Sequence, residues 1–509
     1  MSADTGVPAP TTPSRALPGW LAAGVTFLAS GAVLVLEITG LRLIAPYVGI
    51  TLQTNTAVIG FALAAIALGA WAGGQAADRT DPRRLIAPLM VAGGGLIVAV
   101  LPLVRFAGEL FTGAAAANVL LLAAIAVVVP AALLSAVPPM IVALQLNSLD
   151  ETGSVVGKLS GIGTLGGIAA TFGTGFVLVA VLPSSVIMVG AGLLTALVGV
   201  AVGVLLRRGP GEGAGRVPPA LLLLVLLGPL LAAVAPTPCQ EETTYHCARV
   251  VADPDREGGR TLVLDTLRHS YVDLDDPTYL EFEYVRAIAS VTDAMAPAGE
   301  PLSALHLGGG GLTLPRYLAT VRPGTTSEVL EVDPGVLAVD EAELGVRTSE
   351  QLRVRIGDAR VGLAEQAAGT RDLVVGDAFG GLSVPWQLTT TEALDLVSRA
   401  MTPEGVYAAN LIDNPPLEFV RAELATLAEV FEHVALVARA PVLAGDDGGN
   451  VVAVASHQPL PIGGIEAALA QQDLAWQVAE GAELDRFVGQ APVLTDDFAP
   501  VDQLLTPYG

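Results

Sequence analysis

The chain has 509 residues and a formal net charge of −24, so it is long enough for two or three domains. The charge is uneven: residues 1–237 carry ten Lys and Arg and eight Asp and Glu, whereas residues 238–509 carry 16 and 42. An acidic second half argues against nucleic acid as a partner, because binding needs basic contacts to phosphate. The two cysteines, Cys239 and Cys247, are too few for a disulfide scaffold or a four-ligand zinc site.

The first half contains apolar runs that are long enough to cross a bilayer, which takes about 20 residues each as a helix. Seven runs are predicted to span, at residues 20–44, 52–74, 85–105, 117–144, 159–182, 184–206 and 217–236. The fourth run contains three prolines, which leaves eight spans open. We therefore expect a disordered tail at residues 1–19 and an α-helical membrane domain at residues 20–237, with the lipid bilayer as a partner.

The basic residues of the first half gather in alternate loops. They are Arg79, Arg83 and Arg84 after the second run, Lys158 before the fifth, and Arg207, Arg208 and Arg216 before the seventh. Cytoplasmic loops are enriched in such residues, which places the N-terminus inside and, with seven spans, the second half outside. In an oxidising compartment Cys239 and Cys247 would pair. Two unpaired thiols in a cytoplasmic domain remain the alternative.

From residue 302 onward, short apolar runs alternate with helical patterns. The predicted strands are 302–307, 327–332, 352–356, 372–376, 405–411, 431–438 and 450–456. The predicted helices are 312–321, 334–344, 360–368, 388–401 and 416–430. This alternation predicts an α/β fold over residues 301–509, a Rossmann-like, methyltransferase-type doubly wound sheet. Residues 238–300 are expected to form a small β-subdomain and a linking helix.

Glycines and carboxylates follow successive predicted strands, at the edge where such sheets bind ligands. Gly308, Gly309, Gly310 and Gly311 follow the first strand. Glu331 lies about 20 residues further on, where a carboxylate can accept hydrogen bonds from two ribose hydroxyls. Asp358 and Asp377 follow the third and fourth strands. The glycines lack the G-x-G-x-x-G spacing, so the pattern points away from dinucleotides and toward an adenosyl sulfonium cofactor.

Residues 245–456 resemble the polyamine aminopropyltransferases (the spermidine synthase family), and in particular the membrane-fused bacterial members of that family. The matching motifs are Asp265 with His269 for D-G-x-x-Q, Asp275 to Glu281 for D-E-x-x-Y-x-E, Gly308 to Gly311 followed by Arg316 for G-G-G-D-G-G and its following arginine, Glu331-Val-Asp333 for E-I-D, Asp358-Ala359 for D-A, and Asp377 for the first aspartate of D-S-S-D-P.

The resemblance implies transfer of an aminopropyl group from decarboxylated S-adenosylmethionine to a small amine, putrescine, without a metal. It implies the following roles: Asp377 as base; Tyr279 to orient the amine; Glu281, Asp265, His269 and Asp276 for substrate; Gly308, Gly309, Gly310, Gly311, Glu331, Asp333, Asp358 and Ala359 for the cofactor. Within these, Glu331 would hold the ribose and Asp358 the adenine, while Asp333 precedes Pro334 and could instead cap the next helix. A homodimer is left open.

Three departures from the family pattern keep other functions open. His269 replaces a glutamine, Gly311 replaces the loop aspartate, and Gly380 replaces the second aspartate of D-S-S-D-P. Fewer acidic groups remain to hold a diamine. The alternatives are a non-catalytic polyamine or nucleoside binding or transport protein, and an S-adenosylmethionine-dependent methyltransferase with an unknown acceptor. These cofactors are made in the cytoplasm, so an external domain would need a supply route.

Overall fold

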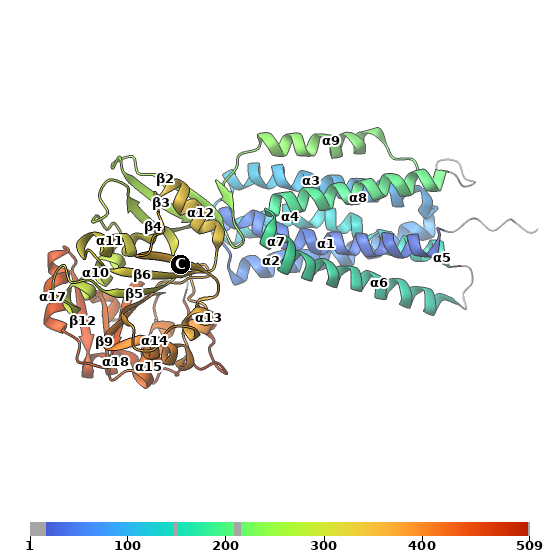
Figure 1. The fold of residues 1–509 in the computed structure, drawn as a ribbon. Coiled ribbons are helices and arrows are strands. Elements are labelled where there is room, and N and C mark those ends of the chain that lie inside the picture. The colour runs from blue at the N-terminus through green and yellow to red at the C-terminus, as the bar shows by residue number, and fades with distance from the viewer. Residues whose placement is uncertain (1–16, 114, 147–150, 208–214, 507–509) are drawn as a thin grey trace, which may run out of the picture. The chain divides into compact units, whose positions relative to one another are not determined.

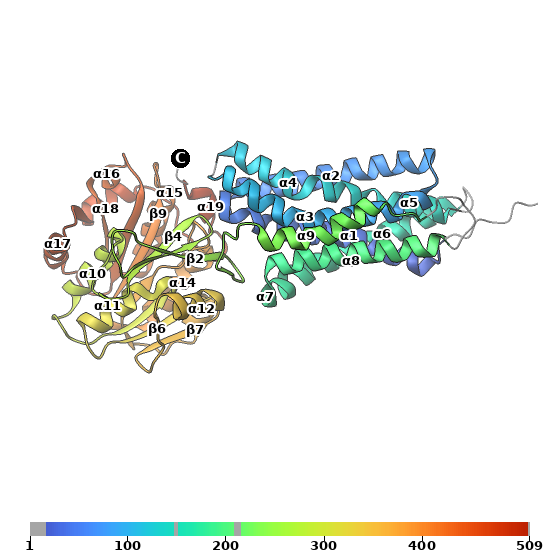
Figure 2. The same cartoon turned by 90° about the horizontal axis from the view of Figure 1, so that it is seen from above.

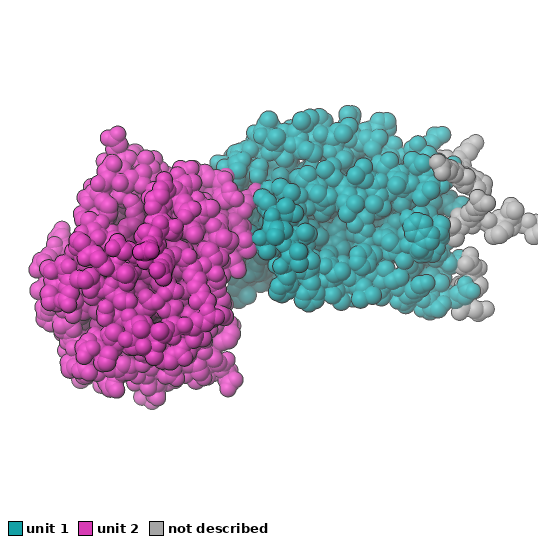
Figure 3. Space-filling view, viewed as in Figure 1, with its two compact units in different colours: residues 1–238 teal, residues 239–509 magenta. Residues whose placement is uncertain are grey.

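The computed structural model describes residues 17–113, 115–146, 151–207 and 215–506. The chain divides after Pro238 into two compact units, coloured separately in Figure 3. Most of the tail predicted at residues 1–19, and Arg208, lie outside the described residues.

The first unit is helical. Its helices are α1 (Gly19–Val48), α2 (Leu52–Arg79), α3 (Ile86–Leu110), α4 (Ala116–Ser135), α5 (Val137–Gln145), α6 (Thr152–Phe172), α7 (Val179–Val181), α8 (Ser184–Arg207) and α9 (Pro219–Val234). A π-helical segment, Gly173–Leu178, joins α6 to α7. Among the described residues, six helical segments are long and apolar enough to cross a membrane. The seventh predicted run forms α9, whose 16 residues are fewer than the roughly 17 that a span needs.

Figure 2 shows the helices of this unit from a second direction, and small residues allow two of them, α2 and α4, to pack closely. A Cβ at Gly69 would lie 2.1 Å from the carbonyl oxygen of Ala132, and one at Gly73 would lie 2.4 Å from that of Ala136. These glycines let α2 approach α4 closely, as is common between membrane helices. Lys158, predicted to lie in a loop, lies instead within α6, because that helix begins at Thr152.

The second unit begins with a four-stranded antiparallel sheet, in the order β1-β2-β3-β4. Its strands are β1 (Glu241–Glu242), β2 (Cys247–Ala252), β3 (Gly259–Leu264) and β4 (Leu267–Asp273). Asp265 has a φ of 55° in the tight turn that joins β3 to β4. Helix α10 (Glu283–Met295) then leads to the larger sheet.

The larger sheet has eight strands in the order β12-β10-β11-β9-β8-β5-β6-β7. They are β5 (Ser303–Leu307), β6 (Thr326–Glu331), β7 (Leu352–Ile356), β8 (Arg371–Gly376), β9 (Met401–Asp413), β10 (His433–Arg439), β11 (Gly449–Ser456) and β12 (Trp476–Glu480). Strands β5 to β9 pair in parallel, and β11 runs antiparallel between β9 and β10. This arrangement confirms the predicted Rossmann-like, methyltransferase-type α/β fold.

Helices cover both faces of this sheet (Figure 1). Helices α10, α11 (Thr313–Val321) and α17 (Ile462–Gln471) pack on one face. The other face carries α13 (Ala359–Ala364), α14 (Thr391–Ala400), α15 (Glu418–Val430) and α18 (Gly481–Val488). Helix α12 (Pro334–Glu343) packs against the small sheet, while the short α16 (Ala440–Leu443) and α19 (Val501–Leu504) lie further along the chain.

The order of the strands locates the ligand edge. The chain crosses from β5 outward to β6 and β7, and then returns to the other side of β5 for β8 and β9. Ligands bind at such a reversal, outside the carboxyl ends of the strands. Here those ends carry Gly308 after β5 and Asp377 after β8.

Candidate functional site

The glycine loop after β5 needs glycine for two reasons. Gly308 has a φ of 97°, and a Cβ there would lie 2.2 Å from the carbonyl oxygen of Asp377. Gly311 has a φ of 70°, and its N–H donates to Oδ2 of Asp340 at 3.1 Å. Side chains other than hydrogen are strained at such φ values. The loop therefore brings bare backbone against the end of β8.

Glu331, the last residue of β6, contacts this loop. Its carboxylate accepts hydrogen bonds from the N–H of Gly309 at 2.8 Å and from the N–H of Asp333 at 2.7 Å. The side chain is buried, and this burial raises its pKa. Each carboxylate oxygen has two lone pairs, so both can accept a further hydrogen bond.

Asp377 lies directly after β8 and is held by two donors. The hydroxyl of Tyr284 donates to Oδ2 at 3.2 Å, and Nδ2 of Asn410 donates to Oδ1 at 2.8 Å. Burial raises the pKa of Asp377 to about 6, against the lowering effect of both hydrogen bonds. A carboxylate with a pKa near neutrality is suited to general base work.

A small cavity of about 40 Å³ adjoins Asp377. The cavity lies between the eight-stranded sheet and helices α10 and α11, next to the glycine loop. Its polar side chains belong to Ser270, Tyr284, His306, Thr313 and Asp377, and its other lining residues are Val285, Ile288, Gly308, Gly309, Gly310, Leu312, Leu314, Pro315 and Val375. Asp377 and the glycine loop therefore line the same cavity.

Tyr279 and its neighbours form a separate network. The Tyr279 hydroxyl donates to Oε2 of Glu281 at 2.6 Å, and the guanidinium of Arg256 lies 3.7 Å from the centre of the Tyr279 ring. Arg256 also pairs with buried Asp273 and, at 3.3 Å, with Asp276. None of these side chains lines the described cavity. The tyrosine hydroxyl that contacts Asp377 belongs to Tyr284, whereas the resemblance assigned Tyr279 to orient the amine.

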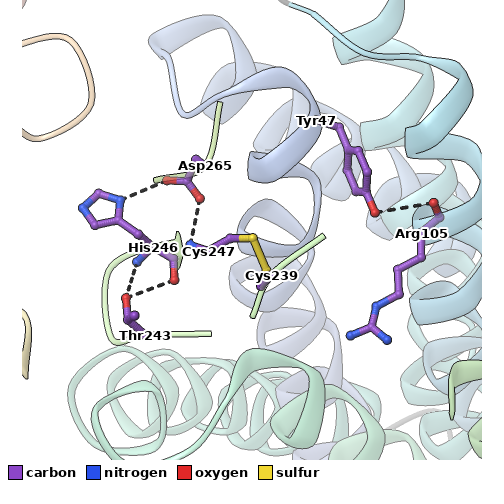
Figure 4. The surroundings of a disulfide bond; sticks show 7 residues. All are labelled: Tyr47, Arg105, Cys239, Thr243, His246, Cys247 and Asp265. Atoms are coloured by element: carbon purple, nitrogen blue, oxygen red, sulfur yellow. Dashed lines mark hydrogen bonds and ion pairs between the residues drawn. A yellow bond between two sulfur atoms is a disulfide. The ribbon is translucent and has the colours of Figure 1, made fainter. Parts of the chain in front are cut away.

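Asp265 and His269 both lie near His246, a histidine for which the sequence suggested no role. Figure 4 shows Asp265 and His246. Asp265 accepts from the N–H of Cys247 at 3.0 Å and contacts Nδ1 of His246 at 3.0 Å. The rings of His246 and His269 are centred 6.0 Å apart. Burial, and then the neighbouring His246, lower the pKa of His269 to about 4. At neutral pH His269 is therefore uncharged.

Asp333 and Asp358 both cap helices. Asp333 accepts from the N–H of Gly335 at 2.9 Å at the start of α12, and from the hydroxyl of Thr243 at 2.5 Å. Asp358 accepts from the N–H of Val361 at 3.1 Å at the start of α13, whose first residue is Ala359. Because Asp333 is buried and both of its carboxylate oxygens already accept hydrogen bonds, they are less open to a ligand than those of Asp358, which is exposed.

Cys239 and Cys247 are joined by a disulfide, with their Cα atoms 5.1 Å apart (Figure 4). The bridged loop contains Thr243, which contacts Asp333, and His246, which contacts Asp265. The disulfide thus closes the segment that contacts Asp333 and Asp265. In the described part of the chain, no three His, Cys, Asp or Glu side chains gather as a metal site would require.

Two contacts of Asp377 were missed from sequence, and one of them left a usable signal. Asn410 lies near the carboxyl end of β9, the strand beside β8, so the strand-end rule applied to β9 would have selected it. Tyr284 lies in the first turn of α10, and nothing in its local sequence separates it from Tyr279.

Comparison with known proteins gives similarity at low identity. No family model matches the chain. A polyamine aminopropyltransferase of Vibrio vulnificus (strain CMCP6) is 32% identical over 122 residues, covering 23% of this chain and 40% of that protein. An eEF1A lysine and N-terminal methyltransferase of Danio rerio is 29% identical over 129 residues, covering 24% of this chain and 19% of that protein. A solved structure of a probable spermidine synthase from Corynebacterium glutamicum ATCC 13032 is 29% identical with a TM-score of 0.48, covering 52% of this chain and 98% of that one.

The chain thus spans less than half the length of either of these two curated relatives. It is distantly similar to aminopropyltransferases and to methyltransferases, two classes of group-transferring enzyme.

Proposed function

We propose that the second unit is an aminopropyltransferase of the spermidine synthase type, which transfers an aminopropyl group from decarboxylated S-adenosylmethionine to an amine. The observation that carries this proposal is the position of Asp377, a carboxylate with a pKa of about 6 that lines a cavity beside the glycine loop. Similarity to polyamine aminopropyltransferases supports it. Putrescine is the acceptor that this similarity suggests.

The adenosyl group would bind across the ends of β5, β6 and β7. Glu331 would accept the ribose hydroxyls with its remaining lone pairs, and Asp358 would accept from the adenine amino group. Three apolar side chains around these strand ends are exposed although they are large, and a flat base would cover them: Val332 at 44%, Ile356 at 43% and Val361 at 56%. Exposed apolar surface of this kind often marks a binding site.

The chemistry asks little of the protein beyond positioning and one proton transfer. The sulfonium supplies an activated leaving group when the co-substrate is bound. An amine acceptor is protonated at neutral pH, and Asp377 would take its proton so that the nitrogen lone pair can attack the carbon bonded to sulfur. The carbon–sulfur bond then breaks with its electrons going to sulfur. Tyr284 and Asn410 hold the carboxylate in place.

A methyltransferase is the second candidate, and a specific observation favours it. Gly311 and Gly380 stand where the aminopropyltransferase pattern has aspartates, so two groups that could recognise ammonium are absent. Similarity to an eEF1A lysine and N-terminal methyltransferase points the same way. A third candidate, a binding protein without turnover, would use the same pocket without a role for the pKa of Asp377.

The first unit would anchor the enzyme in a membrane as a multi-span bundle. Six helical segments of the described chain suit this role by length and composition. The distribution of arginines and the disulfide together favour an extracytoplasmic second unit. The second unit lies outside the cytoplasm only if α9 also crosses the bilayer, because an odd number of spans is needed.

The test compares two co-substrates that could donate the transferred group. The full-length protein in detergent is incubated with an amine mixture and either decarboxylated S-adenosylmethionine or S-adenosylmethionine, and the nucleoside and amine products are identified by mass spectrometry. Methylthioadenosine with an aminopropylated amine supports the first candidate. S-adenosylhomocysteine with a methylated product would replace it with the second, and no product with either donor would leave the binding role.

A further inference from the structure

Three polar side chains form a row across neighbouring strands of the larger sheet. Nδ2 of Asn450, on β11, donates to Oδ1 of Asn410, on β9, at 2.9 Å. Nδ2 of Asn410 in turn donates to Oδ1 of Asp377, directly after β8, at 2.8 Å. The register of the strands explains the row, because β9 lies between β8 and β11 and Asn410 is paired with Val452. Asn450 is therefore the diagonal neighbour of Asn410 on the same face of the sheet.

The chemistry of the three groups fixes the direction of these hydrogen bonds. A deprotonated carboxylate can only accept, so the amide of Asn410 must turn its nitrogen toward Asp377. Its oxygen then faces Asn450, whose amide nitrogen donates to it. Asn410 is 3% exposed, so water does not readily replace a lost partner. Without the donor at Asn450, the buried oxygen of Asn410 would be left unpaired.

An unpaired oxygen favours the reversed amide, with the oxygen of Asn410 toward Asp377. In that orientation Asn410 accepts a hydrogen bond from the protonated carboxyl group and repels the carboxylate. A hydrogen bond to the neutral form of an acid stabilises that form. The donor at Asn450 thus favours the arrangement in which Asp377 is deprotonated and able to receive a proton.

Other titratable groups near this row leave the carboxylate without a charged partner. Tyr284 reaches Asp377 from α10 and is a neutral donor. His306, on β5, lines the same cavity, and burial, followed by the charge of Arg371, lowers its pKa to about 3, so it is uncharged. No Lys, Arg or further acid lines that cavity. Beside Asn450, the guanidinium of Arg439 at the end of β10 pairs with Asp447 at 3.0 Å.

We propose that Asn450 is a positioning residue for the proton transfer, acting through the amide of Asn410 to keep Asp377 ready to accept the proton of the amine. This role rests on the proposed function and extends its site to a third strand. Asn450 is half-buried and does not line the cavity, so it acts without touching the amine there.

The experiment measures kcat/KM for the amine against pH, with the full-length protein in detergent and decarboxylated S-adenosylmethionine. It compares the wild type, Asn450→Leu, Asn410→Leu and the double variant. In Asn450→Leu the rising limb should move to higher pH by about half a unit to one unit. The value of kcat/KM at pH 5 should then fall about three- to tenfold, while the value at pH 9 stays close to that of the wild type.

The double variant tests whether Asn450 acts through Asn410. Its rising limb should coincide with that of Asn410→Leu, because the side chain through which Asn450 acts is already gone. Asn450→Ala removes the donor without adding apolar bulk and should shift the limb as Asn450→Leu does. Asn414→Leu is the matched control, since Asn414 is also half-buried but donates to the carbonyl oxygen of Thr506 at 2.9 Å. Its limb should stay at the wild-type pH.

Two results would overturn this role and leave aminopropyl transfer intact. The first is a rising limb at the wild-type pH in both variants of Asn450. The second is a double variant whose shift is the sum of the two single shifts. Absence of transfer to any amine by the wild type would overturn the proposed function, and the role of Asn450 with it.

Discussion

The hydroxyl of Tyr284 donates a hydrogen bond to Oδ2 of Asp377 across 3.2 Å, and so joins the first turn of α10 to the end of β8. Burial and the charge of Asp377 raise the pKa of Tyr284 well above its usual value, so the phenol remains a hydrogen-bond donor. A donor that stays protonated can hold a carboxylate ready to receive a proton from elsewhere.

Tyr284→Phe removes this donor with little change in shape. We expect kcat/KM for amine transfer to fall about tenfold or more, because Asp377 loses an orienting hydrogen bond of roughly 1.5–3 kcal/mol. Tyr279→Phe is the matched control, because its hydroxyl contacts Glu281 and lies outside the cavity lining. Steady-state rates of both variants give the comparison. Equal losses, or a larger loss in Tyr279→Phe, would contradict the importance given to the contact between Tyr284 and Asp377.

The pH dependence follows from the raised pKa of Asp377. A general base works only when deprotonated, so kcat/KM should rise with pH up to about pH 6 and cease to depend on this group above it. Asn410→Leu removes a hydrogen bond that lowers the pKa of Asp377, so the rising limb should move to higher pH by about one unit. Profiles of kcat/KM from pH 5 to 9 measure the rising limb of the wild type and of Asn410→Leu. If the rising limb of Asn410→Leu stays at the wild-type pH or moves to lower pH, the pH dependence does not report the titration of Asp377.

Gly308→Ala tests whether the loop conformation matters for the nucleoside. The added methyl group meets the carbonyl oxygen of Asp377, and φ is 97°, so the loop must move. We expect methylthioadenosine to bind at least about 100-fold more weakly by calorimetry, from strain and clash of roughly 3 kcal/mol. Gly463→Ala lies in α17 with open space around it and should bind as the wild type does. Unchanged binding by Gly308→Ala would remove the loop from the site.

The disulfide should stabilise the second unit. Replacing both Cys239 and Cys247 by serine frees the segment that contacts Asp333 and Asp265, and we expect a loss of about 2–3 kcal/mol. Thermal unfolding in detergent should show the loss as a lower midpoint. Reductant should lower the midpoint of the wild type similarly and leave the double variant unchanged. If reductant shifts both proteins alike, the effect does not come from this disulfide.

Much of the second unit was predictable because its pattern is local. Each run that forms β5 to β8 is followed within two residues by glycine or aspartate, and each predicted strand lies within about one residue of the observed one. The region after Ser456 was not predicted: β12 pairs only with β10 at the edge of the sheet, and its alternation of buried and exposed residues is weak. The seventh span was predicted from the apolar run 217–236, but α9 covers only Pro219–Val234 of that run.

The site was predictable where it lies at strand ends and not where it depends on packing. Glu331 and Asp377 follow strands, so position alone selected them. Tyr284 approaches Asp377 from a helix that packs across the sheet, and His306 faces the cavity from inside β5, where its neighbours suggest only a buried core strand. Contacts of this kind depend on tertiary packing, which a single sequence does not display.

The most direct measurement is the release of methylthioadenosine by the full-length protein and by Asp377→Asn, with decarboxylated S-adenosylmethionine, in the presence and absence of amine. We predict release by the wild type only when amine is present, and at least about 100-fold less by Asp377→Asn, with methylthioadenosine binding unchanged. Equal release by the two proteins, or release by the wild type that does not depend on amine, would contradict the assignment of Asp377 as the base of an aminopropyl transfer.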